Sequence, residues 1–162
     1  LRFAGKKTAL IGGIINKILD QTEPSILTTP GSDYLQMFFA QCVKNNVEYV
    51  VMEVSSHALS LDRVHGIKFD AVGFTNLSSE HMDFYQTLDE YFQAKCKIFD
   101  QVNPDGFVII NNDNTWGKEA AKNHIINKLP GTLIPFQENS TFTVTQNSLD
   151  GLRLIINNSI EL

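Results

Sequence analysis

The sequence lacks the features that mark membrane-spanning, disulfide-rich and nucleic-acid-binding proteins. It has two cysteines, Cys42 and Cys96, without metal-ligand spacing, which predicts buried thiols in a reducing compartment, the cytoplasm. The apolar run Thr8–Ile15 is broken by glycines and is too short for a membrane span or a signal sequence. The 13 basic residues are dispersed and the net charge is -5, which argues against a nucleic-acid-binding surface.

What the sequence has is a regular alternation of short β-type runs with helical patterns. The segments are Thr8–Gly12, Ser32–Asn45, Tyr49–Val54, Asp70–Thr75, Thr87–Gln101, Phe107–Asn111, Thr115–Lys128 and Thr132–Phe136. Their order predicts one α/β domain over residues 1–162, a doubly wound and mainly parallel sheet with flanking helices. The apolar runs Val50–Val54 and Val108–Ile110 predict central strands.

The two ends of the chain have patterns of their own. Gly5 followed by Lys6 and Lys7 is typical of a helix end, so we expect further sequence upstream. Near the other end, Thr141–Gln146 and Leu152–Asn157 alternate around turn residues, which predicts an antiparallel hairpin. Ser32 is expected to cap the first full helix.

Lys95 is the most anomalous residue in these patterns. Thr87 and Glu90 form a capping box that anchors the helix phase. Lys95 then falls in the middle of an apolar stripe, whereas Lys97 lies on the polar side. The stripe consists of Leu88, Tyr91, Phe92, Phe99 and Val102. Lys95 extends its ammonium to solvent, or pairs with a carboxylate from elsewhere in the chain, or is partly buried, with a lowered pKa and an amine that can react with carbon dioxide.

Two further candidates follow predicted strands. Glu53 ends an apolar strand, where a carboxylate is well placed for Mg²⁺, although an acid capping the next turn is the simpler alternative. His81 follows the strand Asp70–Thr75 by a short polar loop. A lone loop histidine is more often a surface residue, and the flanking Glu80 and Asp83 could supply carboxylates instead.

Two polar segments have structural and functional interpretations. Thr28–Gly31 can be a turn before the helix, or a site whose hydroxyls and N–H groups bind an anionic substrate. Asn111–Asn114 can end a strand and cap a helix, or contact the base and ribose of a nucleotide.

Five blocks of the sequence, taken in order, resemble the Mur ligase family, most closely its tripeptide synthetases (the MurE type). The blocks are Leu27–Pro30, Glu53–Leu59 with Arg63, Phe74–Leu77 with His81 and Asp83, Tyr91–Lys95, and Asn111 with Asp113. The resemblance covers essentially the whole chain and is densest from Leu27 to Asp113. It implies the central, ATP-binding domain of that family, with a fold like that of the P-loop NTPases.

The resemblance also implies roles for individual residues. Mur ligases of this type bind Mg²⁺ and ATP, phosphorylate the carboxylate of a UDP-MurNAc-dipeptide, and form an amide with an incoming amino acid. By resemblance Lys95 is carbamylated and helps to hold the second Mg²⁺, together with Glu53 and His81. The muramoyl substrate would contact Thr28, Thr29, Ser55, Arg63 and Asn76. Asn111 and Asp113 would contact the nucleotide.

Some positions depart from the family's pattern. Leu27 stands where Asn is frequent, Leu61 where some members have Gln, and Glu80 where Asp is usual. No G-x-x-G-K-[ST] phosphate loop occurs in these 162 residues, so we expect the chain alone to be catalytically inert. The alternatives are another Mur-type ligase, a folylpolyglutamate synthase, or a non-catalytic module that kept the fold.

Overall fold

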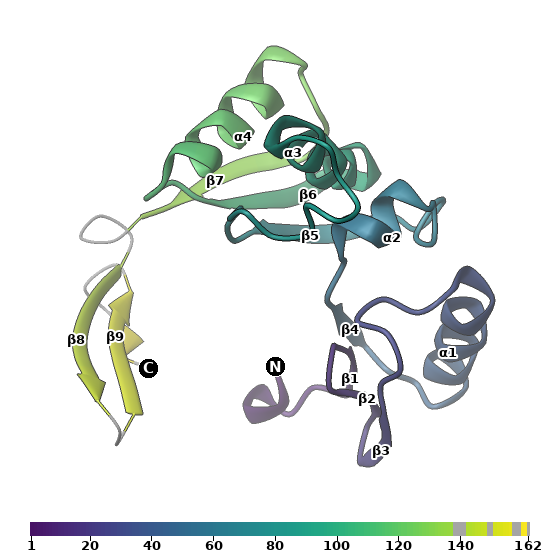
Figure 1. The fold of residues 1–162 in the computed structure, drawn as a ribbon. Helices are drawn as coiled ribbons and strands as arrows, with labels where there is room; N and C mark the ends of the chain where they lie inside the picture. Colours follow the sequence, from purple (N-terminus) through teal and green to yellow (C-terminus); the bar gives the residue numbers. More distant parts are fainter. Residues whose placement is uncertain (138–141, 149–150, 157–159, 162) are drawn as a thin grey trace. The chain divides into compact units, whose positions relative to one another are not determined.

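The computed structural model describes residues 1–137, 142–148, 151–156 and 160–161. The chain forms two compact units, Leu1–Ile67 and Lys68–Leu162, and each is described by itself (Figure 1). The predicted α/β class, with parallel strand pairs and flanking helices, is confirmed. That residues 1–162 make a single domain stays a prediction.

The first unit is built on a mixed four-stranded sheet with the order β3-β2-β1-β4. Its strands are β1 (Thr8–Ile11), β2 (Ile15–Ile18), β3 (Gln21–Pro24) and β4 (Tyr49–Met52). β1 pairs in parallel with β4 and antiparallel with β2. β4 is therefore an edge strand of this sheet, and the prediction that it is central is wrong within this unit.

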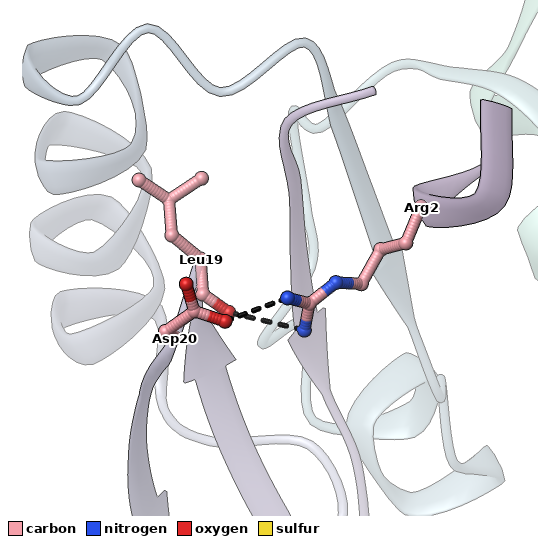
Figure 2. Close-up of polar contacts among 3 residues, drawn as sticks. All are labelled: Arg2, Leu19 and Asp20. Carbon is pink, nitrogen blue, oxygen red and sulfur yellow. Dashed lines mark hydrogen bonds and ion pairs between the residues drawn. The ribbon is translucent and has the colours of Figure 1, made fainter. Parts of the chain in front are cut away.

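The β2–β3 hairpin was not predicted, because its sequence carries little hydrophobic pattern. All four residues of β3 are exposed, so no alternation of apolar and polar residues marks it as a strand. A short 3₁₀ helix, η1 (Arg2–Ala4), lies nearby and ends at Gly5 in the left-handed region, with φ 73°, as its glycine predicted. Arg2 reaches the hairpin turn, where it pairs with Asp20 at 2.6 Å and donates to the Leu19 carbonyl at 3.5 Å (Figure 2).

Two helices complete the first unit. In α1 (Ser32–Lys44), the residues Leu35, Phe38 and Cys42 are buried on one face. The helical spacing predicts that Val43 shares this face, but Val43 is 77% exposed. Its N-cap is Gly31 rather than Ser32, and no side chain caps it, so the prediction for Ser32 is wrong by one position. The one-and-a-half-turn helix α2 (Ser56–Ser60) follows β4 and is capped by Ser55.

The second unit contains a parallel sheet with the order β5-β6-β7. The strands are β5 (Phe69–Phe74), β6 (Val102–Asn111) and β7 (Thr132–Phe136), and the helices are α3 (Leu88–Cys96), η2 (Lys97–Gln101) and α4 (Thr115–Ile126). β6 is the central strand, as predicted. Val72, Phe74, Val108 and Ile110 are buried against α3 and α4, and the alternate residues Phe107 and Ile109 are exposed.

The remaining predictions about the fold hold where the structure describes the residues. β8 (Phe142–Ser148) and β9 (Gly151–Ile156) pair as an antiparallel hairpin, and β10 (Ile160–Glu161) adds to β9. Thr141 and Asn157 lie outside the described residues. Both cysteines are buried thiols, and burial raises the pKa of Cys96 to about 12. None of the described helices has the length and hydrophobicity needed to cross a membrane.

Candidate functional site

In the first unit, the Thr28–Thr29 turn meets the end of β4 through a buried hydroxyl. Thr29 is 1% exposed. Its Oγ1 donates to the Glu53 carbonyl at 3.0 Å and accepts from the Ser55 N–H at 2.9 Å. Because Oγ1 both donates and accepts, it fixes the turn against the segment that leads into α2.

Arg63 completes this network from the segment after α2. Its Nη1 donates to the Thr29 carbonyl at 3.0 Å, while the Ser55 Oγ accepts from the Ala58 N–H at 3.2 Å as the helix cap. Among the described residues the guanidinium makes this one hydrogen bond, so most of its five N–H donors are available there. Thr29, Ser55 and Arg63 are thus brought together in one hydrogen-bonded network.

Ser56, the first residue of α2, adds a buried polar atom to this region. The residue is 3% exposed, and its Oγ has no hydrogen-bond partner among the described residues. A buried hydroxyl left unpaired is costly. The Ser55–Ser56 pair therefore has hydrogen-bonding capacity that the described protein groups do not use.

Glu53 follows β4 directly and is held by a glycine turn. Its Oε2 accepts from the Gly13 N–H at 2.9 Å, in the turn that joins β1 to β2. A Cβ added at Gly13 would lie 3.3 Å from both the Glu53 Oε2 and the Thr28 Oγ1, so carboxylate and hydroxyl both border this turn. Ser55, not Glu53, caps the following helix. The exposed carboxylate has the oxygen donors that Mg²⁺ prefers.

In the second unit, Lys95 is half-buried on α3 and its ammonium lies over an aromatic ring. The Nζ is 5.1 Å from the centroid of Tyr91, one helical turn earlier. Burial lowers the pKa of Lys95 from 10.5, and the charge of Glu80 opposes this shift. The lysine is therefore not a fully solvated side chain, and the tertiary acid expected near it is Glu80. A lowered pKa makes the neutral amine more accessible.

His81 contacts the same aromatic residue. Its ring meets Tyr91 edge-on, with centroids 5.7 Å apart and an interplanar angle of 88°. The backbone of His81 has φ 58°, a left-handed conformation that non-glycine residues adopt sparingly and that often occurs at functional sites. Its carbonyl accepts from the N–H groups of Phe84 and Tyr85, which fixes the exposed loop.

Tyr91 is the residue whose contacts the sequence prediction missed, because it was assigned to the apolar stripe and to a family block but given no role in the site. The structure places its ring in contact with both predicted residues of this unit, His81 and Lys95. The available signal was its spacing, since an aromatic residue four positions before a lysine meets it on a helix surface.

Three more predicted residues lie at carboxyl ends of the second unit's strands. Asn76 follows β5, and its Oδ1 accepts from the Leu77 N–H at 2.8 Å. Asn111 ends β6, and its Oδ1 accepts from the Asp113 N–H at 3.0 Å. The predicted helix cap in this segment is Asn114. Strand ends of this kind are where α/β proteins collect ligands.

Gly117 allows α4 to approach Asn111 closely. A Cβ at this position would lie 1.7 Å from the Asn111 carbonyl oxygen, so only glycine fits. The position of Asn111 therefore depends on a contact between backbones.

The residues predicted to bind a metal belong to two different units. Among the residues that the structure describes, no group of three or more His, Cys, Asp or Glu side chains could hold a metal ion. Glu53 belongs to the first unit, and His81 and Lys95 to the second. Each fits the prediction by its own chemistry, as an exposed carboxylate, an exposed imidazole and an amine with a lowered pKa.

A comparison with protein families decides the relationship. The family model of the Mur ligase middle domain matches residues 1–154. The chain belongs to the Mur ligase family.

Two curated relatives are UDP-N-acetylmuramoyl-L-alanyl-D-glutamate–2,6-diaminopimelate ligases. The one from Clostridium perfringens is 45% identical over 122 residues, 75% of this chain and 25% of that protein. The one from Corynebacterium glutamicum is 46% identical over 121 residues, 73% of this chain and 23% of that protein.

Solved structures support the fold assignment. A UDP-N-acetylmuramoyl-L-alanyl-D-glutamate–2,6-diaminopimelate ligase matches with a TM-score of 0.80 at 22% identity, over 97% of this chain and 33% of that chain. An FPGS–AMPPCP complex matches with a TM-score of 0.58 at 13% identity, over 97% of this chain and 46% of that chain. This Mur ligase chain spans about a quarter of the length of the curated relatives.

Proposed function

We propose that this chain is the middle domain of a bacterial, cytoplasmic ligase that adds a third amino acid to UDP-MurNAc-L-Ala-D-Glu in peptidoglycan synthesis. The curated relatives at 45% and 46% identity carry this substrate in their names, together with 2,6-diaminopimelate. Diaminopimelate is therefore the proposed amino acid, and lysine is the competing outcome. The observation that carries the proposal is the Thr29–Ser55–Arg63 network, because it joins three residues that the family resemblance assigns to the muramoyl substrate.

The proposed reaction has two steps. The substrate carboxylate attacks the γ-phosphorus of ATP, which forms an acyl phosphate and releases ADP. The amine of the amino acid then attacks the acyl carbon, a C–N bond forms, the C–O bond to phosphate breaks, and the amine gives up a proton. Such chemistry depends on positioning and on stabilising developing negative charge.

The first unit positions the substrate in this proposal. The Thr28 hydroxyl and the remaining N–H groups of Arg63 hold the anionic muramoyl dipeptide, and the hydrogen bonds of Thr29 keep the turn from moving when it binds. Asn76 adds an amide from the second unit. Asn111 and Asp113 hold the base and ribose of the nucleotide.

Charge on the phosphates is the second requirement. A bound Mg²⁺ would supply positive charge that offsets the negative charge developing on the phosphates. Glu53 would hold it through the oxygen that the Gly13 contact leaves available, and His81 through its imidazole. Lys95 would contribute as a carbamate: its neutral amine attacks the carbon of carbon dioxide, a C–N bond forms as one C=O π bond opens, and the nitrogen loses a proton. The result is one negative charge shared by two oxygens.

The test uses the full-length enzyme, with phosphate release measured in the presence of ATP, Mg²⁺ and UDP-MurNAc-L-Ala-D-Glu. We expect release that depends on diaminopimelate. Release that depends on lysine alone would correct the amino acid. No release with either amino acid, or release with D-alanyl-D-alanine instead, would contradict the proposal.

A further inference from the structure

Two ring contacts join α4 to the helical segment that precedes it, one at each end of α4. At the first turn, the Trp116 ring lies against Phe92 of α3, with centroids 5.2 Å apart. At the last turn, the His124 ring meets Phe99 of η2 edge-on, with centroids 6.0 Å apart. Because α3 and α4 cover the same face of the β5-β6-β7 sheet (Figure 1), these contacts help to set how the two helices lie against each other.

The two ends of α4 differ in what surrounds them. The first turn comes directly after Asn111 and Asp113, which are proposed to hold the nucleotide. The last turn is tied to the connection that leads into β7, where the His124 Nε2 lies 3.0 Å from the Pro130 carbonyl oxygen. Trp116 and His124 are separated by about 12 Å along the helix axis. Only the contact of Trp116 therefore adjoins residues proposed for the ligase reaction.

The first turn of α4 is held directly against the backbone of Asn111. A Cβ at Gly117, the neighbour of Trp116, would lie 1.7 Å from the Asn111 carbonyl oxygen, so there is no space between the two segments. The Asn111 Oδ1 in turn accepts from the Asp113 N–H at 3.0 Å. Closely packed segments transmit a displacement rather than absorb it. A shift of the Trp116 ring is therefore passed on to Asn111 and Asp113.

The partner of Trp116 belongs to the helix that carries Lys95. The residue before Phe92 is Tyr91, whose ring contacts both His81 and Lys95. Phe92 is 5% exposed, and a second ring, that of Phe74 at the end of β5, lies 6.3 Å from it. Phe92 is thus enclosed, and a movement of α3 changes its contact with α4.

We propose that Trp116 is a positioning residue for the ligase reaction, which sets the distance between the nucleotide segment Asn111–Asp113 and the helix that carries Lys95. The inference rests on the proposed function, because the roles of these residues come from it. Trp116 acts through Phe92 on one side and through the backbone at Gly117 on the other. A ring that served only the core would stabilise this unit without changing the affinity for nucleotide.

The test compares Trp116→Leu with His124→Leu in the full-length enzyme. Each substitution removes one of the two ring contacts of α4, so each should lower the free energy of unfolding in urea. We expect Trp116→Leu to raise the KM for ATP, and the Kd of a non-hydrolysable ATP analogue measured by calorimetry, by about tenfold. His124→Leu is the matched control and should keep both constants within about twofold of the parent. Trp116→Phe keeps a ring and should restore most of the affinity.

Equal Kd values for Trp116→Leu and His124→Leu would overturn the inference, since a loss of packing alone lowers the folded fraction and leaves the Kd of the folded enzyme unchanged. If Trp116→Leu fails to fold, the parent enzyme labelled with 5-fluorotryptophan supplies the decision. The ¹⁹F resonance that is missing from Trp116→Phe belongs to Trp116. It should shift as the ATP analogue saturates the enzyme, and an unshifted resonance would overturn the inference.

Failure of this inference and failure of the proposed function have different signatures. A parent that binds the ATP analogue but forms no amide with the muramoyl substrate would contradict the proposed reaction alone. Normal turnover of the parent, together with an unchanged Kd in Trp116→Leu, would contradict the role of Trp116 alone.

Discussion

The proposed ligase residues of the two units are held in different ways. In the first unit, Thr29 and Arg63 are fixed by hydrogen bonds to carbonyl and N–H groups of the backbone. In the second, Lys95 and His81 both contact the ring of Tyr91, Lys95 by a cation–π contact and His81 by an edge-on ring contact. Hydrogen bonds to the backbone define a side chain's position more tightly than ring contacts do. The residues proposed to position the substrate are thus held more tightly than the side chains of Lys95 and His81.

The strongest way to break this contrast is to remove Lys95. Lys95→Ala in the full-length enzyme should lower kcat by about 10³-fold, because a group that stabilises developing phosphate charge is lost. Added acetate should restore part of the rate, since it supplies a similar pair of oxygens. Lys97→Ala, two residues on and exposed, is the control and should keep nearly full activity. Equal losses for both variants would remove the special role of Lys95.

The next largest effect concerns the backbone of the second unit. Gly117→Ala places a Cβ 1.7 Å from the Asn111 carbonyl oxygen, so α4 must move away from β6. We expect the free energy of opening of α4, measured by hydrogen exchange on the full-length protein, to fall by about 3 kcal/mol. Gly73→Ala is the control, because an added Cβ at Gly73 meets nothing within 4 Å. The amides of α4 in this variant should keep the exchange protection of the unchanged protein. Unaltered exchange of the α4 amides in Gly117→Ala would contradict the close approach of α4 to Asn111.

The preorganisation of the first unit can be tested with two adjacent threonines. Thr29→Val removes a buried hydroxyl that both donates and accepts, so the Ser55 N–H should exchange faster, with about 2 kcal/mol less protection. The exposed Thr28→Val should change protection by less than about 0.5 kcal/mol and raise the KM for the muramoyl substrate instead. Identical protection in both variants would contradict the assigned network.

The smallest effect is the pH dependence that Lys95 contributes. Because burial lowers its pKa below 10.5, the folded protein binds fewer protons than the unfolded chain between the lowered pKa and 10.5. The contribution of Lys95 to stability should therefore rise with pH across that window, and its unfavourable term should be fully present below the lowered pKa. The free energy of unfolding of Lys95→Met and of its parent can be measured in urea at a series of pH values. The rise with pH that Lys95 contributes should be present in the parent and absent in Lys95→Met.

Much of the second unit followed from the sequence, because its elements carry clear patterns. The capping residue Thr87 accepts from the Glu90 N–H at 3.1 Å, although the Glu90 carboxylate accepts from Gln86 rather than from Thr87. Of the apolar stripe around Lys95, Leu88 is partly buried and the other four residues are buried, although α3 ends at Cys96, before Phe99 and Val102. Periodicity of this kind is local, and it survives folding when a helix packs on a sheet.

The sequence was less informative where contacts are made across long separations. The exposed β3 has no apolar pattern, and the bonds of Thr29 to residues 53 and 55 join segments more than 20 positions apart. The close approach at Gly117 and the two neighbours of the Tyr91 ring depend on tertiary packing. The ordered motifs identified the family, but the partners of each residue came from the fold.

The most direct test of the account is the state of Lys95 in the full-length enzyme, crystallised with UDP-MurNAc-L-Ala-D-Glu, an ATP analogue, Mg²⁺ and high bicarbonate. We predict density for a carbamate on Nζ that binds Mg²⁺, with the Thr29–Ser55 hydrogen bond unchanged from 2.9 Å. An unmodified ammonium that points to solvent in that complex would contradict the proposed role of Lys95.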